Sequence, residues 1–201
     1  MNSEAIPDYA QDRGPALESR QKLLQFAAQF LGEEIPDDTL LFMISGRYEF
    51  VNKGIDVFLE ALGRVKGDDG QGRGVLAFVC VLGGHLEHRM ESPADRGPGP
   101  ARLSTHRLPD ENNDPILNKC LSLGITNAPG DKLKAIYIPV YLSEGDGVLN
   151  MSYYDVLRGM DVTVFPSKYE PWGYTPLESA VYAVPTVTSD VAGFGTWIQK
   201  R

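Results

Sequence analysis

Long hydrophobic segments and positive charge are both scarce in this sequence of 201 residues. No apolar run approaches the roughly 20 residues that a membrane-spanning helix needs, and the N-terminus lacks the basic-then-apolar order of a secretory signal peptide. Acidic residues outnumber basic ones by 27 to 19, and the resulting net charge of −8 argues against non-specific binding to nucleic acid, which needs clustered Lys and Arg. These absences predict a cytoplasmic protein that binds neither membranes nor nucleic acid.

Cysteines and histidines are also few, and their surroundings do not suggest a disulfide or a metal site. Cys80 lies in an apolar run typical of a strand, and Cys120 lies on the apolar side of a helical pattern, which predicts two buried and reduced thiols. His85 and His88 are three positions apart without further ligands nearby, and His106 has no evident partner. The sequence therefore predicts no metal site.

Common nucleotide-binding motifs are absent as well. The sequence contains neither the G-x-G-x-x-G pattern of dinucleotide-binding folds nor the G-x-x-x-x-G-K-[ST] pattern of a P-loop. A phosphate-binding site in this chain therefore has to be assembled from separate segments.

The sequence does contain a regular alternation of apolar runs and helical patterns. Residues 1–16 are polar and predict a tail or linker, whereas residues 17–201 predict one domain that starts with a helix at Leu17. The runs that predict buried strands lie at 39–46, 74–84, 132–141, 161–167 and 185–190. Helical patterns between them indicate an α/β fold, a Rossmann-like parallel sheet with helices on both faces.

Two segments that follow strands carry the residues suited to bind a ligand, and ligands of such sheets bind beyond the carboxyl ends of the strands. The segment after the first strand, "SGRYEFVNKG", contains Arg47 and Lys53. The segment after the fourth strand leads into a helix whose first residues predict a capping box, with Thr175 as N-cap and Glu178 three residues later. The N–H groups of that first turn, the helix dipole and the two cations favour a diphosphate.

Glycine and aromatic residues accompany these charges. Gly173 has no side chain to keep a ligand from the backbone, and the rings of Tyr153, Trp172 and Tyr174 can hold a base or a sugar.

Each of these residues also has a purely structural interpretation. Glu178 can serve only as part of the capping box, and Glu170 can be a solvated carboxylate in a turn. The two cations can be surface charges, and Tyr153 and Trp172 can be packing residues. Their joint placement after two strands of one sheet favours ligand binding.

Three stretches resemble the sugar-donor domain of the glycogen synthase family of glycosyltransferases. They are "SGRYEFVNKGIDVFLEALGRV", "PDENNDPILNK" and "FPSKYEPWGYTPLESAVYAVPTVTSDVAGFG", and the resemblance extends from about Leu23 to Gly195. The last stretch contains the paired glutamates of retaining glycosyltransferases, Glu170 and Glu178, together with the Trp-Gly-Tyr-Thr that marks this family. The resemblance implies one half of a two-domain, GT-B type glycosyltransferase that uses UDP-glucose, with ADP-glucose as the alternative donor.

The resemblance also implies roles for individual residues. Arg47 and Lys53 would bind the donor phosphates, and Glu170 would lie beside the transferred glucose, so these three form the implied catalytic group. Glu178 would hold the ribose hydroxyls, and Tyr153 would stack on uracil. The segment that would bind glucose and phosphate consists of Trp172, Gly173, Tyr174 and Thr175.

The implied reaction extends an α-1,4-glucan at its 4-hydroxyl with retention of configuration. No metal or other cofactor is implied, because Arg, Lys and helix amides can stabilise the leaving diphosphate. The family's acceptor-side Rossmann domain and final helices are not found in this sequence, so we expect a truncated fragment that binds donor weakly and has little or no turnover alone. In the whole enzyme its partners would be UDP-glucose, the glucan acceptor and the missing N-terminal domain.

Two other interpretations of the sequence stay open. One is a Rossmann-like binding or regulatory module for another phosphorylated ligand, and the other is a related sugar-nucleotide transferase or epimerase. Binding of UDP in preference to simple phosphate separates the first of these from a glycosyltransferase.

Overall fold

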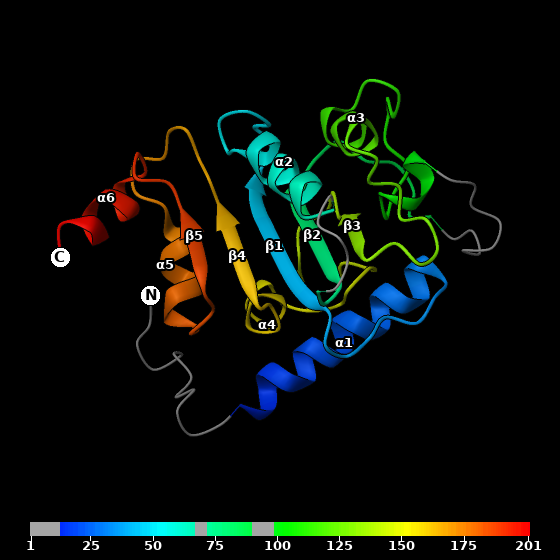
Figure 1. Ribbon diagram of the computed structural model, residues 1–201, viewed down its shortest axis with the longest axis horizontal. Helices are drawn as coiled ribbons and strands as arrows, with labels where there is room; N and C mark the ends of the chain where they lie inside the picture. The colour runs from blue at the N-terminus through cyan, green and yellow to red at the C-terminus, as the bar shows by residue number, and fades with distance from the viewer. Residues whose placement is uncertain (1–12, 67–71, 90–98) are drawn as a thin grey trace.

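The computed structural model describes residues 13–66, 72–89 and 99–201, and its centre is a five-stranded sheet (Figure 1). The strands lie in the order β3, β2, β1, β4, β5, and all neighbours in this order are parallel. Their bounds are β1 Leu40–Arg47, β2 Val75–Leu82, β3 Leu133–Tyr137, β4 Val162–Phe165 and β5 Thr186–Thr188. All five predicted strands are present, which confirms the predicted parallel α/β sheet.

Helices connect the strands and begin or end at residues suited to those positions. The described helices are α1 Gly14–Leu31, α2 Ile55–Lys66, the 3-10 helix η3 Pro100–Arg102, α3 Pro115–Ser122, α4 Tyr153–Arg158, α5 Tyr174–Val181 and α6 Gly193–Gln199. Helix α1 begins three residues before the predicted start at Leu17, because Pro15 is favourable in a first turn, where its missing N–H costs no hydrogen bond. The rest of the predicted tail, residues 1–12, lies outside the described residues. Helix α6 was not predicted.

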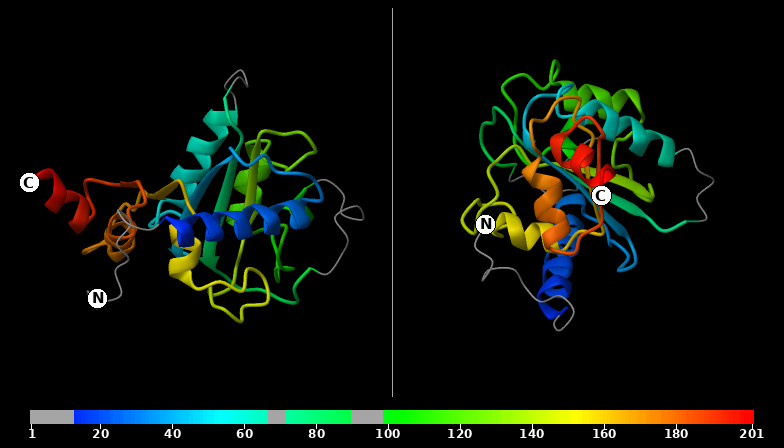
Figure 2. Two further views of the ribbon diagram at one scale, coloured as in Figure 1. Left: turned by 90° about the horizontal axis from the view of Figure 1, so that it is seen from below. Right: turned by 90° about the vertical axis from the view of Figure 1, so that its left-hand side faces the viewer.

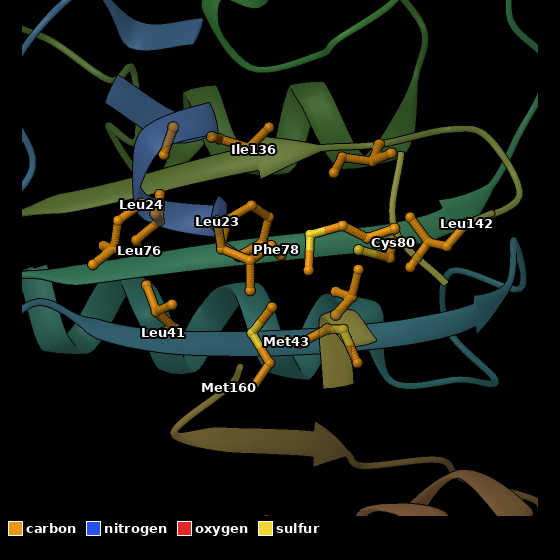
Figure 3. Packing of buried hydrophobic residues seen from close by; sticks show 14 of the residues in the cluster. Leu23, Leu24, Leu41, Met43, Leu76, Phe78, Cys80, Ile136, Leu142 and Met160 are labelled. Carbon is orange, nitrogen blue, oxygen red and sulfur yellow. The ribbon is translucent and has the colours of Figure 1, made fainter. Parts of the chain in front are cut away.

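Helices α1 and α4 cover one face of the sheet, whereas α2 and α3 cover the other (Figure 2). The apolar stripe of α1, which includes Leu23 and Leu24, packs on side chains of β1 and β2 such as Met43 and Phe78 (Figure 3). Burial of each such side chain is worth about 1.5–3 kcal/mol, so this layer is a main source of stability. Cys80 and Leu142 continue the layer towards the carboxyl ends of the strands (Figure 3).

The opposite face explains why the second predicted strand is an unbroken apolar run. Alternate residues of β2, such as Ala77 and Val79, pack against α2 and α3, while Leu76 and Phe78 pack towards α1. Because successive side chains of a strand point to opposite faces, a strand covered on both sides needs apolar residues at every position.

The two cysteines are free and buried, as predicted. Burial raises the pKa of the Cys80 thiol and of the Cys120 thiol to about 12, so both remain protonated at neutral pH. Among the described residues, no helix combines the length and hydrophobicity needed to cross a membrane.

The strand order places the candidate ligand-binding loops next to each other. The chain leaves β1 for β2 and β3 on one side and returns to β4 on the other side, so β1 pairs with both β2 and β4. The loops that follow β1 and β4 leave the sheet at the same edge, at the top of Figure 1. Where the strand order reverses in this way, ligands of open α/β sheets bind in a crevice at the carboxyl ends of the strands.

Candidate functional site

The loops after β1 and β4 contact each other directly. The Lys168 N–H donates to the Asn52 carbonyl at 2.8 Å. Gly54 has a left-handed φ of +68°, and a Cβ at this position would lie 2.2 Å from the Pro166 carbonyl oxygen. Only glycine allows this approach without displacing the backbone, and the contact fixes the spacing between the two loops.

A cavity of about 420 Å³ opens at the carboxyl ends of β1 and β2. It is lined by Ser45, Gly46, Arg47, Cys80, Leu82, Val140, Tyr141, Leu142, Tyr153, Tyr154, Thr175 and Glu178. The Tyr153 hydroxyl lies 3.5 Å from the Ser45 hydroxyl, and burial raises the pKa of Tyr153, so its ring presents a neutral aromatic surface. We call this the large cavity, and its largely apolar lining suits a planar base or another apolar group.

A second cavity of about 20 Å³ lies beside the large one, and Thr175 lines both. It is lined by Lys53, Phe165, Ser167, Glu170, Gly173, Thr175, Pro176, Thr188 and Ala192. We call this the small cavity. Lys53 Nζ donates to Glu170 Oε2 across it, and both side chains are mostly buried. This volume holds about one water molecule, so a larger ligand group can enter only if the ion pair separates.

Helix α5 begins earlier than the sequence predicts, and the predicted capping box is wrong. Its N-cap is Gly173 with φ +96°, no side chain caps the helix, and Thr175 lies inside its first turn. The left-handed turn at Gly173 already directs the chain into the helix, which leaves Glu178 a full turn from the cap. The Glu178 carboxylate accepts a hydrogen bond from the Tyr154 hydroxyl at 3.1 Å instead, and burial raises the pKa of Glu178.

Helix α6 supports the loop that carries Glu170. The Gly193 N–H donates to the Glu170 carbonyl at 3.0 Å, and the Phe194 N–H donates to the Trp172 carbonyl at 2.6 Å. A Cβ at Gly193 would lie 2.2 Å from the Pro171 carbonyl oxygen. The backbone of the loop is therefore held against α6, and Gly193 permits the close contact.

The two predicted cations lie at the same edge of the sheet but in different cavities. Arg47 lines the large cavity, where its exposed guanidinium pairs with Glu49 at 2.9 Å, whereas Lys53 lines the small cavity. The sequence predicts that both converge on one crevice with the start of α5. The structure brings them to two cavities that meet at Thr175.

The side chains of Trp172 and Tyr174, whose rings are expected to hold a base or a sugar, line neither of these two cavities. The Trp172 ring packs against Phe194 and Trp197, with ring centres 6.1 and 6.2 Å away, and Tyr174 is 68% exposed. Tyr153, by contrast, lines the large cavity. The packing interpretation therefore describes the Trp172 side chain better.

Several residues that line the large cavity were missed from the sequence. Tyr154 follows Tyr153 on α4, Ser45 lies near the end of β1, and Tyr141 follows β3. All three positions lie near the carboxyl end of a predicted strand or next to a predicted site residue, and that placement was the available signal.

The three histidines come together in space. The His106 ring lies 5.1 Å from that of His85 and 5.2 Å from that of His88, and burial lowers the pKa of His106 to about 4. His106 thus has the partners that the sequence did not reveal. Within residues 13–66, 72–89 and 99–201, no group of three or more His, Cys, Asp or Glu side chains is arranged to hold a metal ion.

Comparison with known proteins finds glycogen synthases among the relatives of this chain. The glycogen synthase family matches residues 21–83 and 95–201. Glycogen [starch] synthase isoform 2 of Saccharomyces cerevisiae is 31% identical over 81% of this chain, and the liver glycogen [starch] synthase of Mus musculus is 30% identical over 82%. The matched regions amount to 32% and 31% of those two proteins, so the chain spans about a third of the length of these relatives.

A solved structure has the same fold at low sequence identity. WaaG, a glycosyltransferase involved in lipopolysaccharide biosynthesis, is similar over 96% of this chain and 37% of its own, with a TM-score of 0.50 and 16% identity. At this identity the likeness supports the fold alone.

Proposed function

Because the chain belongs to the glycogen synthase family, we propose that it is the donor-binding domain of a retaining glucosyltransferase. The proposed reaction transfers glucose from UDP-glucose to the 4-hydroxyl of an α-1,4-glucan. The observation that carries this proposal is the pair of cavities that meet at Thr175, at the position where the strand order reverses. A nucleoside diphosphate sugar has two ends joined by phosphates, and the cavities offer a place for each end.

The large cavity suits the nucleoside. Its apolar lining and the neutral ring of Tyr153 can hold a uracil base by stacking. Glu178, on the same cavity, is an acceptor for the two ribose hydroxyls when its carboxylate is ionised. Burial of the nucleoside at this end would supply affinity without any contribution to the chemical step.

The start of α5 suits the diphosphate. The first N–H groups of an α-helix have no partner within the helix, and the helix dipole favours negative charge there. Gly173 and Thr175 lie at this start and line the small cavity, while Arg47 reaches the large cavity from the opposite loop. Arg47 can exchange Glu49 for a phosphate because its side chain is 75% exposed. We assign the backbone from Trp172 to Thr175 to phosphate and glucose.

The small cavity suits the glucose and the departing phosphate. Lys53 and Glu170 line it, and their ion pair has to separate when a sugar enters. Lys53 would then pair with the donor phosphate, and Glu170 would accept hydrogen bonds from the sugar and stabilise positive charge that develops on its ring.

In the proposed step, the bond between C1 of glucose and the β-phosphate oxygen breaks while the acceptor's 4-hydroxyl oxygen bonds to C1 on the same face. The proton of that hydroxyl moves to the departing diphosphate, so UDP leaves with the electron pair. Arg47, Lys53 and the amides of α5 stabilise its charge, and no metal ion is required. The glucan would be the second substrate, and the second domain of the GT-B arrangement would have to be supplied by a longer protein. We expect the chain alone to have little or no turnover.

Calorimetric titration of this chain with UDP and with inorganic pyrophosphate tests the proposal. We expect UDP to bind at least 10-fold more tightly, because only UDP fills the large cavity. Equal affinities would instead favour a binding module for simple phosphorylated ligands. Release of UDP from UDP-glucose by a longer protein with an acceptor-side domain, measured with and without a glucan, separates a transferase from an epimerase, because only the transferase depends on the glucan.

A further inference from the structure

Tyr154 connects α4 to the glutamate of α5 that faces the large cavity. Its hydroxyl donates to Glu178 Oε1 at 3.1 Å, and both residues line the cavity. The hydrogen bond joins residues 24 positions apart and crosses between two helices. Tyr154 was not among the residues that the sequence singles out, so its contact with Glu178 is a feature that only the fold reveals.

A second contact holds the Tyr154 ring against the C-terminal end of α5. The ring stacks on that of Tyr182, with centres 5.0 Å apart and planes within 4° of each other. Tyr182 is the C-cap of α5, and its N–H donates to the Glu178 carbonyl at 3.0 Å, so it lies one helical turn after Glu178. Tyr154 is therefore held at two points, by its ring on Tyr182 and by its hydroxyl on Glu178.

The hydrogen bond also has a chemical effect on Glu178. Burial raises the pKa of this carboxyl, and the hydrogen bond from Tyr154 opposes that shift. A carboxylate accepts hydrogen bonds at both oxygens, whereas a protonated carboxyl donates from one. By favouring the ionised form and occupying Oε1, Tyr154 leaves Oε2 to accept from hydroxyl groups of a ligand.

We propose that Tyr154 is a positioning residue that holds the Glu178 carboxylate for the ribose hydroxyls and so selects ribonucleotides over 2′-deoxyribonucleotides. This inference rests on the proposed function, because it assumes that the nucleoside of the donor occupies the large cavity. The Tyr154 ring need not touch the ribose, since it acts through Glu178. Its removal should therefore reduce the preference for a ribose without abolishing binding of the diphosphate.

Calorimetric titration of the whole chain with UDP and with 2′-deoxy-UDP tests the inference. We expect the unmodified protein to prefer UDP at least 10-fold, and Tyr154→Phe to weaken UDP binding about 5-fold while the affinity for 2′-deoxy-UDP stays within 2-fold. A 5-fold loss of UDP affinity is the size expected when one hydrogen bond to the Glu178 carboxylate is removed. Tyr169→Phe is the matched control, because Tyr169 is 67% exposed and lines neither cavity.

A double-mutant cycle separates positioning from a general loss of structure. In a Glu178→Gln background, Tyr154→Phe should change UDP affinity by less than 2-fold, because the group that it positions is already altered. If Tyr154→Phe retains the full preference for UDP, or if its effect is equally large in both backgrounds, the inference is wrong while the proposed function stands. If the unmodified protein does not bind UDP at all, both fail.

Discussion

Lys53 and Glu170 form an ion pair although 117 positions separate them in the sequence. One follows β1 and the other follows β4, and the pair closes the small cavity between the two loops. Because both charges are partly removed from water, neither is easily left without a partner. An anionic ligand that also carries hydroxyl groups can satisfy both, with its phosphate on Lys53 and its hydroxyls on Glu170.

Replacement of Lys53 should weaken donor binding. We expect Lys53→Ala to lower UDP affinity at least 10-fold, because a charge-assisted hydrogen bond to phosphate contributes about 1.5–3 kcal/mol. Lys168→Ala is the control, since this lysine lies in the neighbouring loop but is 54% exposed and pairs with Asp56. Calorimetry measures the UDP affinity of both variants. A similar loss of affinity in the two would show that the loss reflects the net charge of the protein and not a contact between Lys53 and phosphate.

Replacement of Glu170 should affect turnover more than binding. In a longer protein that joins this domain to an acceptor-side domain, we expect Glu170→Ala to lower the rate of glucose transfer at least 100-fold while UDP affinity stays within 3-fold. Its carboxylate matters most when positive charge develops on the glucose ring. Glu60→Gln is the control, because Glu60 pairs with Lys119, on the face covered by α2 and α3. A rate within 2-fold of the unmodified enzyme would remove Glu170 from the catalytic group.

The contact between the two loops depends on Gly54. We expect Gly54→Ala to lower the free energy of unfolding by at least about 2 kcal/mol, because the left-handed φ costs a non-glycine residue about 1–2 kcal/mol and the added Cβ meets the Pro166 carbonyl. Gly145→Ala, where a Cβ has no neighbour within 4 Å, should change it by less than 0.5 kcal/mol. Urea denaturation measures the free energy of unfolding of both variants. Equal values would show that the backbone can move to accommodate a Cβ between residue 54 and the Pro166 carbonyl.

His106 should make stability depend on pH. Burial and the nearby His85 and His88 lower its pKa from 6.5 to about 4, whereas Asp146 has a weaker opposite effect. The unfolded chain therefore binds more protons between these values, so the free energy of unfolding falls as pH drops from about 6.5 towards 4.

The variant His106→Gln isolates this contribution. Carboxylates titrate in both proteins, so their effect cancels in the comparison, and the variant should lose less stability than the unmodified protein between pH 7 and pH 4.5. Urea denaturation at the two pH values measures the loss. An identical loss in the two proteins would contradict the assignment to His106.

Strands β2 and β3 were predictable because burial on both faces leaves a largely apolar run. The strand order was not, because residues 39–46 and 161–167 carry no mark of their pairing, and only the structure shows that β1 pairs with β4. The position of Lys53 beside Glu170 depends on that pairing. The sequence therefore indicated which loops carry the candidate site residues. It did not indicate that these residues line two separate cavities.

Local patterns misled where tertiary contacts decide the geometry. Thr175 and Glu178 have the spacing of a capping box, but the turn at Gly173 starts α5 earlier than that spacing predicts. The Glu178 carboxylate accepts a hydrogen bond from the Tyr154 hydroxyl instead. Trp172 resembles a ligand platform in the sequence, whereas α6, which the sequence did not predict, supplies the aromatic rings on which it packs.

A crystal structure of this chain soaked with UDP-glucose tests the central claim most directly. We expect the uracil against Tyr153 in the large cavity, the diphosphate at the N–H groups of Gly173 to Thr175, and the glucose beside Glu170 with the Lys53 ion pair separated. A diphosphate bound elsewhere, or a glucose that leaves the ion pair of Lys53 and Glu170 closed, would contradict the account.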